Sequence, residues 1–365
     1  MWLKEFEPEH HRRIRKVLSM KDYVRYRLTG DFVTDAIEAM GFMLLDATKN
    51  EWSDFLLGLA GLRMNVMPEI VDPAQVLSPM TPAALRDTGL SASTKVIAGS
   101  TDTVMEVYAS GAIRPGQATV KLATAGRICP ITDHAVVSKL LVCYRHVVPG
   151  MWYPGTATKS CAASNRWYRD VLCGAEVLEA QRRNTDPYVL MSADAATVPA
   201  GCDGLMFHPY LQGEITPYCD DMLRGSFTGI SAAHTKAHFN RAVLEGVAYS
   251  MKDCYEVLKT LGIAPDTATV IGGGAKSPLW RQILADMLGI PLSTVENVDS
   301  SLGSAMLAGV AAGVFDSFRH SVEKCVRPKE IVRPNPATQA LYETRFGFYK
   351  RIHDALAPIY HDGED

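Results

Sequence analysis

Three consecutive glycines at positions 272–274 stand between a predicted strand and a predicted helix. The strand is Thr269 to Ile271, and the helix begins with Ser277 as its N-cap and Pro278 at its first position. Glycines let a ligand approach the backbone closely, and the start of a helix offers unpaired N–H groups and a partial positive charge to a phosphate. The segment could therefore hold a nucleotide, although a plain strand-to-helix turn would leave the same pattern. A Rossmann fingerprint is excluded, because its third glycine would fall at Ser277.

A second turn has the residue types of a phosphate site. The β-rich run Ala118 to Ala123 ends in Thr124, Ala125 and Gly126. The Thr124 hydroxyl and the neighbouring N–H groups could bind phosphate oxygens. An ordinary hairpin loop would carry the same residues.

Asp102 is the third candidate. It follows the run Lys95 to Gly99, which we predict to be a short buried strand. Ligands of open α/β sheets bind at the carboxyl ends of strands, so a carboxylate at this place could act on a substrate. The alternative is that Asp102 only caps the helix predicted over Thr103 to Ala109.

Other elements follow from periodicity and turn residues. Apolar spacing predicts one amphipathic helix from His10 to Leu28, ended by Gly30, and a long helix from His234 to Leu261. The segments Ser138 to Val148 and Met151 to Thr156 are rich in residues typical of strands, so we predict strands there. The glycines and proline of residues 111–116 indicate a hinge, so we expect two α/β lobes, 1–114 and 115–330, followed by a helical tail, 331–365.

The composition of the chain argues against several classes of protein. The 365 residues are 47% hydrophobic, which indicates a globular protein. The net charge is −3 and no stretch is strongly basic, so we expect no nucleic-acid partner. The first residues lack the apolar core of a signal peptide, and no run is long enough to span a bilayer, so we expect a cytoplasmic protein without a membrane partner. The eight cysteines form no CxxC pair and predict neither zinc nor disulfides, and we assign no metal ligand.

Taken together, the motifs and their order resemble the FGGY carbohydrate kinases, and within them the xylulose kinases. The resemblance covers nearly the whole chain and is carried by the following segments: Trp2-Leu3-Lys4, Glu7-Pro8-Glu9, Lys21-Asp22-Tyr23, Arg27-Leu28-Thr29-Gly30, Ala98-Gly99-Ser100-Thr101-Asp102, Pro209-Tyr210-Leu211, Gly213-Glu214, Thr216-Pro217, Arg224-Gly225, Arg241 to Gly246, Gly272 to Ser277, Trp280-Arg281-Gln282 and Leu302-Gly303-Ser304-Ala305.

The resemblance implies an actin-like, ribonuclease-H-like fold of two lobes that close over ATP, Mg²⁺ and a sugar. It implies that Asp102 is the catalytic base and that Asp102 and Thr103 contact the sugar. It further implies that Thr124 and Gly126 lie in a phosphate loop, that Gly273, Gly274 and Ser277 contact the nucleotide, and that Gly303 allows two helices to pack closely. The expected reaction is ATP-dependent phosphorylation of a sugar hydroxyl, with a ketopentose such as xylulose as the acceptor.

Three departures accompany the resemblance. No Asp-x-Gly-Thr phosphate motif occurs in the sequence, so we expect an N-terminally truncated chain whose first lobe is incomplete and associates with another chain, such as a second copy in a homodimer. The phosphate loop reads Ala123-Thr124-Ala125-Gly126, where the family has Gly-Thr-Ser-Gly. Thr103 stands where xylulose kinases commonly have Asn. The alternative function is therefore a relic that binds nucleotide or sugar without transferring phosphate.

Overall fold

The computed structural model describes residues 1–362, so the last three residues of the predicted tail, 363–365, lie outside the described residues. The chain forms two compact units. The first comprises Met1–Ile113, Tyr144–Met151 and Asn297–Arg327, and the second comprises Arg114–Cys143, Trp152–Glu296 and the chain from Pro328 onward. Each unit therefore combines segments that are far apart in the sequence.

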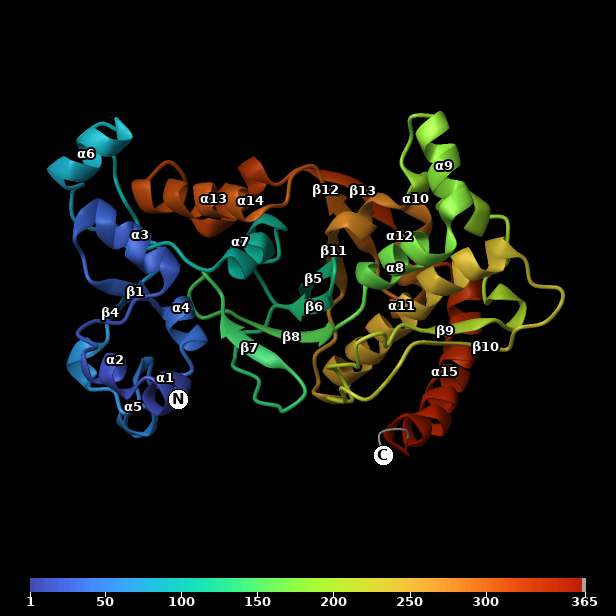
Figure 1. The fold of residues 1–365 in the computed structure, drawn as a ribbon. Coiled ribbons are helices and arrows are strands. Elements are labelled where there is room, and N and C mark those ends of the chain that lie inside the picture. The colour runs from blue at the N-terminus through green and yellow to red at the C-terminus, as the bar shows by residue number, and fades with distance from the viewer. Residues whose placement is uncertain (363–365) are drawn as a thin grey trace. The chain divides into compact units, whose positions relative to one another are not determined.

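The first unit is mainly helical. Its two small sheets are the parallel pair of β1 (Val33–Asp35) with β4 (Glu69–Val71) and the antiparallel pair of β2 (Leu45–Asp46) with β3 (Glu51–Trp52). The α-helices of this unit are α1 (Trp2–Phe6), α2 (Pro8–Arg12), α3 (Met20–Thr29), α4 (Ala36–Gly41), α5 (Asp54–Ala60), α6 (Pro82–Thr88), α7 (Asp102–Ala109), α13 (Ser300–Ala312) and α14 (Phe318–Cys325) (Figure 1).

The single helix predicted over His10 to Leu28 is wrong, because the chain forms α2 and then an extended stretch before α3. In that stretch the Val17 N–H donates to the Val66 carbonyl, 2.9 Å away, which a continuous helix through Val17 would not permit. Helix α3 begins after Ser19, whose hydroxyl accepts a hydrogen bond from the Asp22 N–H. It ends as predicted at Gly30, which has a φ of 82°.

The strand predicted over Lys95 to Gly99 is also wrong. This segment is extended, but its only ladder pairing within the described residues is an isolated bridge between Ile97 and Val76. Its partner is an irregular loop, in which the Pro73 carbonyl accepts from the Gly99 N–H at 2.9 Å. Because proline has no backbone N–H, Pro73 cannot donate the hydrogen bond that a regular ladder would need at this position.

The second unit is built on a seven-stranded sheet with the order β13-β12-β11-β5-β6-β8-β7 (Figure 1). The pairs β12–β11 and β11–β5 are parallel, whereas β13, β6 and β8 run antiparallel to their neighbours β12, β5 and β6. The strands of this sheet are β5 (Gln117–Leu122), β6 (Gly126–Pro130), β7 (Val142–Arg145), β8 (Trp152–Thr158), β11 (Thr267–Ile271), β12 (Leu292–Val295) and β13 (Pro328–Val332). The last two residues of β7, Tyr144 and Arg145, belong to the first unit.

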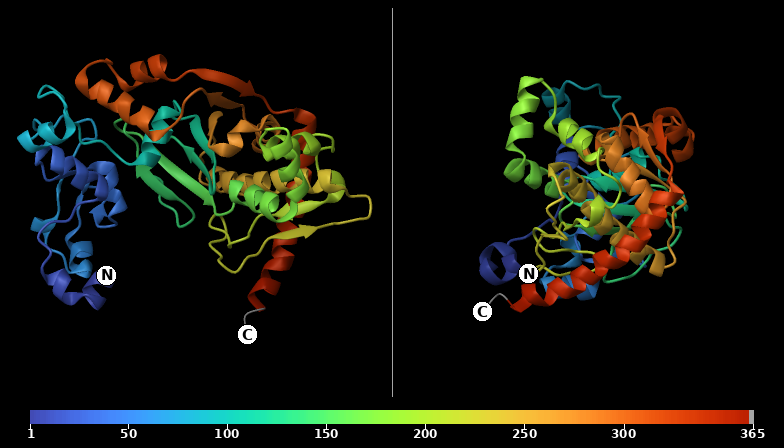
Figure 2. Two further views of the ribbon diagram at one scale, coloured as in Figure 1. Left: turned by 45° about the horizontal axis from the view of Figure 1, so that its top comes forward. Right: turned by 90° about the vertical axis from the view of Figure 1, so that its right-hand side faces the viewer.

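Helices complete the second unit. A short antiparallel pair, β9 (Met206–His208) with β10 (Ser226–Thr228), lies outside the main sheet. The α-helices are α8 (Ala162–Leu172), α9 (Gly174–Arg182), α10 (Pro187–Ala195), α11 (Lys236–Thr260), α12 (Pro278–Leu288) and α15 (Pro336–Asp362), and Figure 2 shows the length of α11 and α15.

Helix α11 is the spine of this unit, as its apolar spacing predicts. Val243, Val247, Met251, Cys254 and Leu258 are fully buried. Most of these side chains pack in one hydrophobic core with side chains of β5, β11 and α12. Residues spaced by three or four positions share one side of a helix, which is why this pattern could be recognised in the sequence.

Glu214 ties α11 to the sheet. Its carboxylate accepts hydrogen bonds from the Thr158 hydroxyl at 2.6 Å, the Ser250 hydroxyl at 3.0 Å, and the backbone N–H groups of Lys159 at 2.9 Å and Ile215 at 2.7 Å. Burial raises the pKa of Glu214, and these hydrogen bonds oppose that effect. The carboxylate therefore joins the end of β8 to the middle of α11.

Among residues 1–362, no helix combines the length and the apolar character needed to cross a membrane.

We expect Glu214→Ala to lower the free energy of unfolding by about 3 kcal/mol, because it leaves several buried donors without an acceptor. Chemical denaturation followed by circular dichroism measures the change. Glu179→Ala is the control, because Glu179 pairs with Arg183 at the surface and its loss should cost less than about 1 kcal/mol. Equal effects of the two substitutions would contradict the linking role of Glu214.

Candidate functional site

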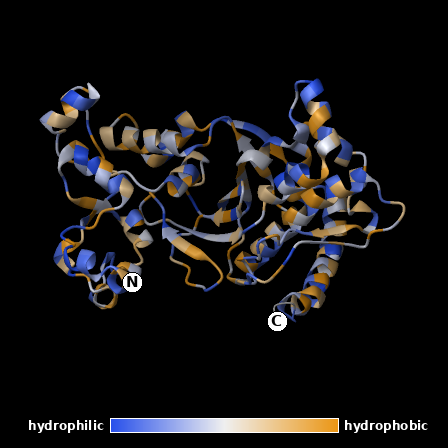
Figure 3. Ribbon diagram, viewed as in Figure 1, coloured by the Kyte–Doolittle hydropathy of each residue, from blue (hydrophilic) through white to orange (hydrophobic). Residues whose placement is uncertain are grey.

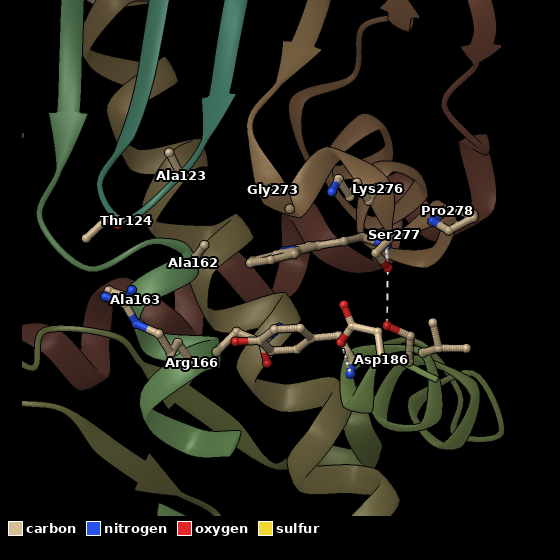
Figure 4. Close-up of a pocket in the computed structure, with 16 residues that line it drawn as sticks. Ala123, Thr124, Ala162, Ala163, Arg166, Asp186, Gly273, Lys276, Ser277 and Pro278 are labelled. Atoms are coloured by element: carbon tan, nitrogen blue, oxygen red, sulfur yellow. Dashed lines mark hydrogen bonds between the residues drawn. The ribbon is translucent and has the colours of Figure 1, made fainter. Parts of the chain in front are cut away.

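A cavity of about 700 Å³ opens in the second unit between the β5–β6 loop, helices α8 and α10, and the glycine turn before α12. Figure 4 shows Gly273 and Ser277 facing Ala162, Arg166 and Asp186 across it. The residues lining it are Ala123, Thr124, Ala162, Ala163, Asn165, Arg166, Asp186, Tyr188, Val189, Ser192, Gly273, Gly274, Lys276, Ser277, Pro278 and Trp280.

Each glycine of the turn meets a different constraint. Gly272 has a φ of 90°, and a Cβ there would lie 2.6 Å from the Leu122 carbonyl oxygen. A Cβ on Gly274 would lie 2.8 Å from the Leu122 Cβ and 2.9 Å from the Trp280 ring. The side of Gly274 on which a side chain would stand is therefore filled by the protein interior. A Cβ on Gly273 would meet no atom within 4 Å, and this glycine lines the cavity. A ligand in the cavity can therefore approach the backbone most closely at Gly273.

The first turn of α12 holds the glycine turn in place. Ser277 is its N-cap, as the sequence predicts, and the Ser277 hydroxyl accepts from the Trp280 N–H at 3.2 Å. The Arg281 guanidinium donates to the Ala275 carbonyl at 2.6 Å, and the Trp280 indole donates to the Leu244 carbonyl of α11 at 3.0 Å. The hydroxyls of Ser277 and Ser192 lie 3.3 Å apart (Figure 4), which connects the turn with α10.

The loop containing Thr124 is the tip of a hairpin in which Leu122 pairs with Gly126. Its carbonyls accept hydrogen bonds from the start of α8, with the Ala162 N–H 2.8 Å from the Ala123 oxygen. Thr124 lines the cavity, but Gly126 is not among the lining residues. A Cβ on Gly126 would overlap Met251 and Thr158, so glycine is needed there for packing.

Charged side chains from both walls accompany the backbone groups. Arg166 comes from α8, Lys276 from the glycine turn, and Asp186 from the N-cap of α10. Burial raises the pKa of the Tyr188 phenol, although Arg169 partly opposes it, so Tyr188 remains a hydrogen-bond donor. The two basic side chains outnumber the one carboxylate of the wall, which favours an anionic ligand.

Asp102 belongs to the first unit, where it is the first residue of α7. Thr101 occupies the N-cap position, so Asp102 does not act as the N-cap. The Asp102 carboxylate accepts from the Thr103 N–H at 2.6 Å and lies 3.3 Å from the Thr103 hydroxyl. Asp102 is solvent-exposed.

A buried ionic network fixes the chain that leads to Asp102. The Arg25 guanidinium donates to the Asp22 carboxylate and to the Ala98 carbonyl, both at 2.8 Å. The Ser100 hydroxyl donates to the Asp35 carboxylate at 2.8 Å. Asp22 and Asp35 have no solvent exposure, so their geometry is tightly constrained.

Lys21 completes this network. Its ammonium lies 2.7 Å from the Asp22 carboxylate and 3.0 Å from that of Asp35. Burial raises the pKa of nearby Glu38, with Lys21 opposing the rise and the charges of Asp35 and Asp22 adding to it. The network therefore joins α3 and the start of α4 to the turn before α7.

Helix α7 is supported by α13, which crosses it at Gly303. A Cβ on Gly303 would overlap the carbonyl of Met105 in α7, so only glycine permits this approach, as expected. Figure 3 shows α13 pale to orange along its length, and its Met306 and Leu307 are buried. The packing of α13 therefore positions the helix that begins with Asp102.

Comparisons with known proteins find relatives over nearly the whole chain. Residues 1–108 match the N-terminal domain of the FGGY family of carbohydrate kinases, and residues 117–312 match its C-terminal domain. The chain belongs to the FGGY family of carbohydrate kinases. It is 30% identical to the xylulose kinase of Bacillus subtilis (strain 168) over 97% of its own length and 69% of that protein. It is also 30% identical to the gluconokinase of Bacillus licheniformis, over 87% of this chain and 62% of that protein.

Solved structures agree with the fold of this FGGY kinase. The crystal structure of xylulose kinase from Rhodospirillum rubrum superposes with a TM-score of 0.89 at 30% identity. It covers 99% of this chain, and this chain covers 72% of it. The expected actin-like, ribonuclease-H-like class of sugar kinases is therefore confirmed.

The FGGY kinase brings four of the predicted site residues together: Thr124, Gly273, Gly274 and Ser277 line one cavity. Asp102 and Thr103 stand together at the start of α7 in the other unit. The lining residues from α8 and α10 were not singled out in the sequence. Helical propensity and capping could locate these helices, but no motif in them indicates a ligand.

We expect Gly303→Val to destabilise the first unit by about 2 kcal/mol, because the side chain would force α13 away from α7. Thermal unfolding measures the loss. Ser304→Val, one position along on an exposed part of α13, should change stability by no more than about 0.5 kcal/mol. If both variants unfold at the wild-type temperature, the helices do not depend on glycine for their contact.

Proposed function

We propose that this carbohydrate kinase transfers the γ-phosphoryl group of ATP to a hydroxyl of a ketopentose such as xylulose, with Asp102 as the general base. The observation that carries the proposal is the cavity lined by Gly273, where a Cβ would meet no atom within 4 Å, in the turn before α12 and opposite α8 and α10. Its volume of about 700 Å³ suits a nucleotide-sized ligand.

In this proposal the nucleotide lies across the cavity. Its phosphates approach Thr124 and the backbone at Gly273, where Lys276 contributes positive charge, and its nucleoside lies between α8 and the start of α12. Mg²⁺ ordinarily binds through phosphate oxygens, water and one or two carboxylates. The described residues contain no group of three His, Cys, Asp or Glu that could hold a metal, which is compatible with an ion that arrives with the nucleotide.

Asp102 would accept the proton of the acceptor hydroxyl as that oxygen forms its bond to phosphorus. Its carboxylate is exposed, and Thr103 donates to one of its oxygens, which orients it. Most of the acceleration in phosphoryl transfer comes from positioning and electrostatic stabilisation, and the base adds about 10²–10⁴-fold. The buried network of Asp22, Arg25 and Asp35 contributes by keeping the turn before Asp102 in place.

The acceptor is proposed from the names of the relatives. Xylulose kinases match this chain at about 30% identity over nearly its whole length. Gluconokinase and autoinducer-2 kinase match at the same identity, so the acceptor panel must include an aldonate as well as ketopentoses.

A protein that binds nucleotide without transferring phosphate is the second candidate. The loop sequence Ala123-Thr124-Ala125-Gly126 favours it, because alanines offer neither a second hydroxyl nor the closest approach of phosphate to the backbone. The two candidates differ in turnover and agree on nucleotide binding.

We expect Gly273→Val to weaken ADP binding about tenfold or more without a loss of stability, since its side chain would occupy the cavity. Gly274→Val should mainly destabilise the fold, because its side chain would meet Leu122 and Trp280. Calorimetry with ADP and thermal unfolding separate the two effects. Wild-type affinity in Gly273→Val would remove the nucleotide from this cavity.

We expect Asp102→Asn to reduce phosphoryl transfer at least about 100-fold while ADP affinity stays unchanged, because the amide keeps the shape but cannot take the proton. A coupled assay of ADP release with xylulose, ribulose and gluconate gives the rates. Asp54→Asn is the matched control, because Asp54 is also an exposed first residue of a helix, α5. Turnover of Asp102→Asn close to that of the control would exclude Asp102 as the base.

A further inference from the structure

Asn165 is a buried amide without a protein partner. Only 9% of the residue is exposed. Within residues 1–362, its side chain forms no hydrogen bond, yet neither of its polar atoms is sealed from solvent. The amide is therefore held by no protein group and stays open to water or to a ligand in the cavity.

The free amide belongs to the cavity wall. Asn165 lines the cavity together with Arg166, the next residue of α8. The neighbour on its other side, Ser164, is satisfied inside the protein, since its hydroxyl donates to the Ser160 carbonyl at 2.7 Å. Asn165 therefore differs from the polar residue beside it in having only the cavity as a source of partners.

Asn165 lies in the first turns of α8, close to the residues that bind the candidate phosphate loop. The Ala162 N–H binds the carbonyl of Ala123, which marks the end of α8 beside Thr124. Asn165 is three residues further along, about 4.5 Å along the helix axis. Asn165 therefore lies about one helical turn beyond the residue that binds this loop.

We propose that Asn165 is a specificity-determining residue that hydrogen-bonds the nucleoside of the phosphate donor. This inference rests on the proposed function, because it takes the cavity as the nucleotide site. A carboxamide has one acceptor oxygen and two N–H donors. Phosphate oxygens of a nucleotide only accept, and they would leave the amide oxygen unpaired. A nucleoside offers donors and acceptors together, on its ribose hydroxyls and on its base edge, and it can satisfy both ends of the amide.

The test substitutes Asn165→Leu, which is similar in size and has no polar group. In the absence of ligand this variant should unfold close to the wild-type temperature, because the Asn165 amide has no protein hydrogen bond to lose. Asn240→Leu is the matched control, because the Asn240 amide donates to the Asp194 carboxylate at 2.7 Å and its loss should lower the unfolding temperature.

Calorimetry with ADP gives the second readout. Asn165→Leu should bind ADP roughly tenfold more weakly than the wild type, while pyrophosphate, which lacks a nucleoside, should compete with ADP equally well in both proteins. Inosine diphosphate and 2′-deoxy-ADP identify the partner atom. The penalty of the substitution should disappear with the analogue that has already lost the group bound by Asn165.

Unchanged ADP affinity in Asn165→Leu would overturn this inference, and so would an equal loss for pyrophosphate. A lower unfolding temperature of the free variant would also overturn it, because the amide would then have a structural role. These results differ from failure of the proposed function, which would appear as the absence of ADP binding by the wild-type protein.

Discussion

The close contact between the glycine turn and the end of β5 is the constraint on which the candidate nucleotide site depends. Gly272 stands against the carbonyl of Leu122, and Gly274 against the side chain of the same residue. Because any side chain would separate these segments, the ends of β5 and β11 can lie together only with glycine at both positions. The contact brings the β5–β6 loop with Thr124 and the first turn of α12 with Ser277 to one cavity.

In the first unit, buried charged side chains hold the turn before Asp102. This turn follows no regular strand, and the extended segment before it has only one isolated bridge and a few backbone hydrogen bonds to an irregular loop. Arg25 binds the carbonyl of Ala98, and Asp35 binds the hydroxyl of Ser100, which adds hydrogen bonds from buried charged side chains to this limited pairing. Hydrogen bonds that involve a charged group are stronger than neutral ones, and a low-dielectric interior strengthens them further. The position of the proposed base therefore depends on residues more than sixty positions away in the sequence.

Local features of the site could be predicted from the sequence, and long-range ones could not. The cap at Ser277 depends on its own helix and on the proline that follows it, so it could be recognised and is confirmed. The family and fold followed from the order of many motifs, and they are confirmed. Which glycine of the turn lines the cavity was not predictable. The surroundings of Gly274 depend on Leu122, which is far away in the chain. The strand at Lys95 to Gly99 was wrong for the same reason, since its outcome depends on a partner loop that contains Pro73.

The measurement that tests the account most directly follows the γ-phosphate itself. The chain is incubated with ATP labelled on that phosphate, with Mg²⁺ and with each acceptor, and the label is counted in the sugar phosphate and in free phosphate. The account predicts that label appears in the phosphorylated sugar, faster with a ketopentose than without an acceptor. Label found only as free phosphate, or left on ATP in a protein that binds ADP, would show that this chain holds nucleotide without acting as a kinase.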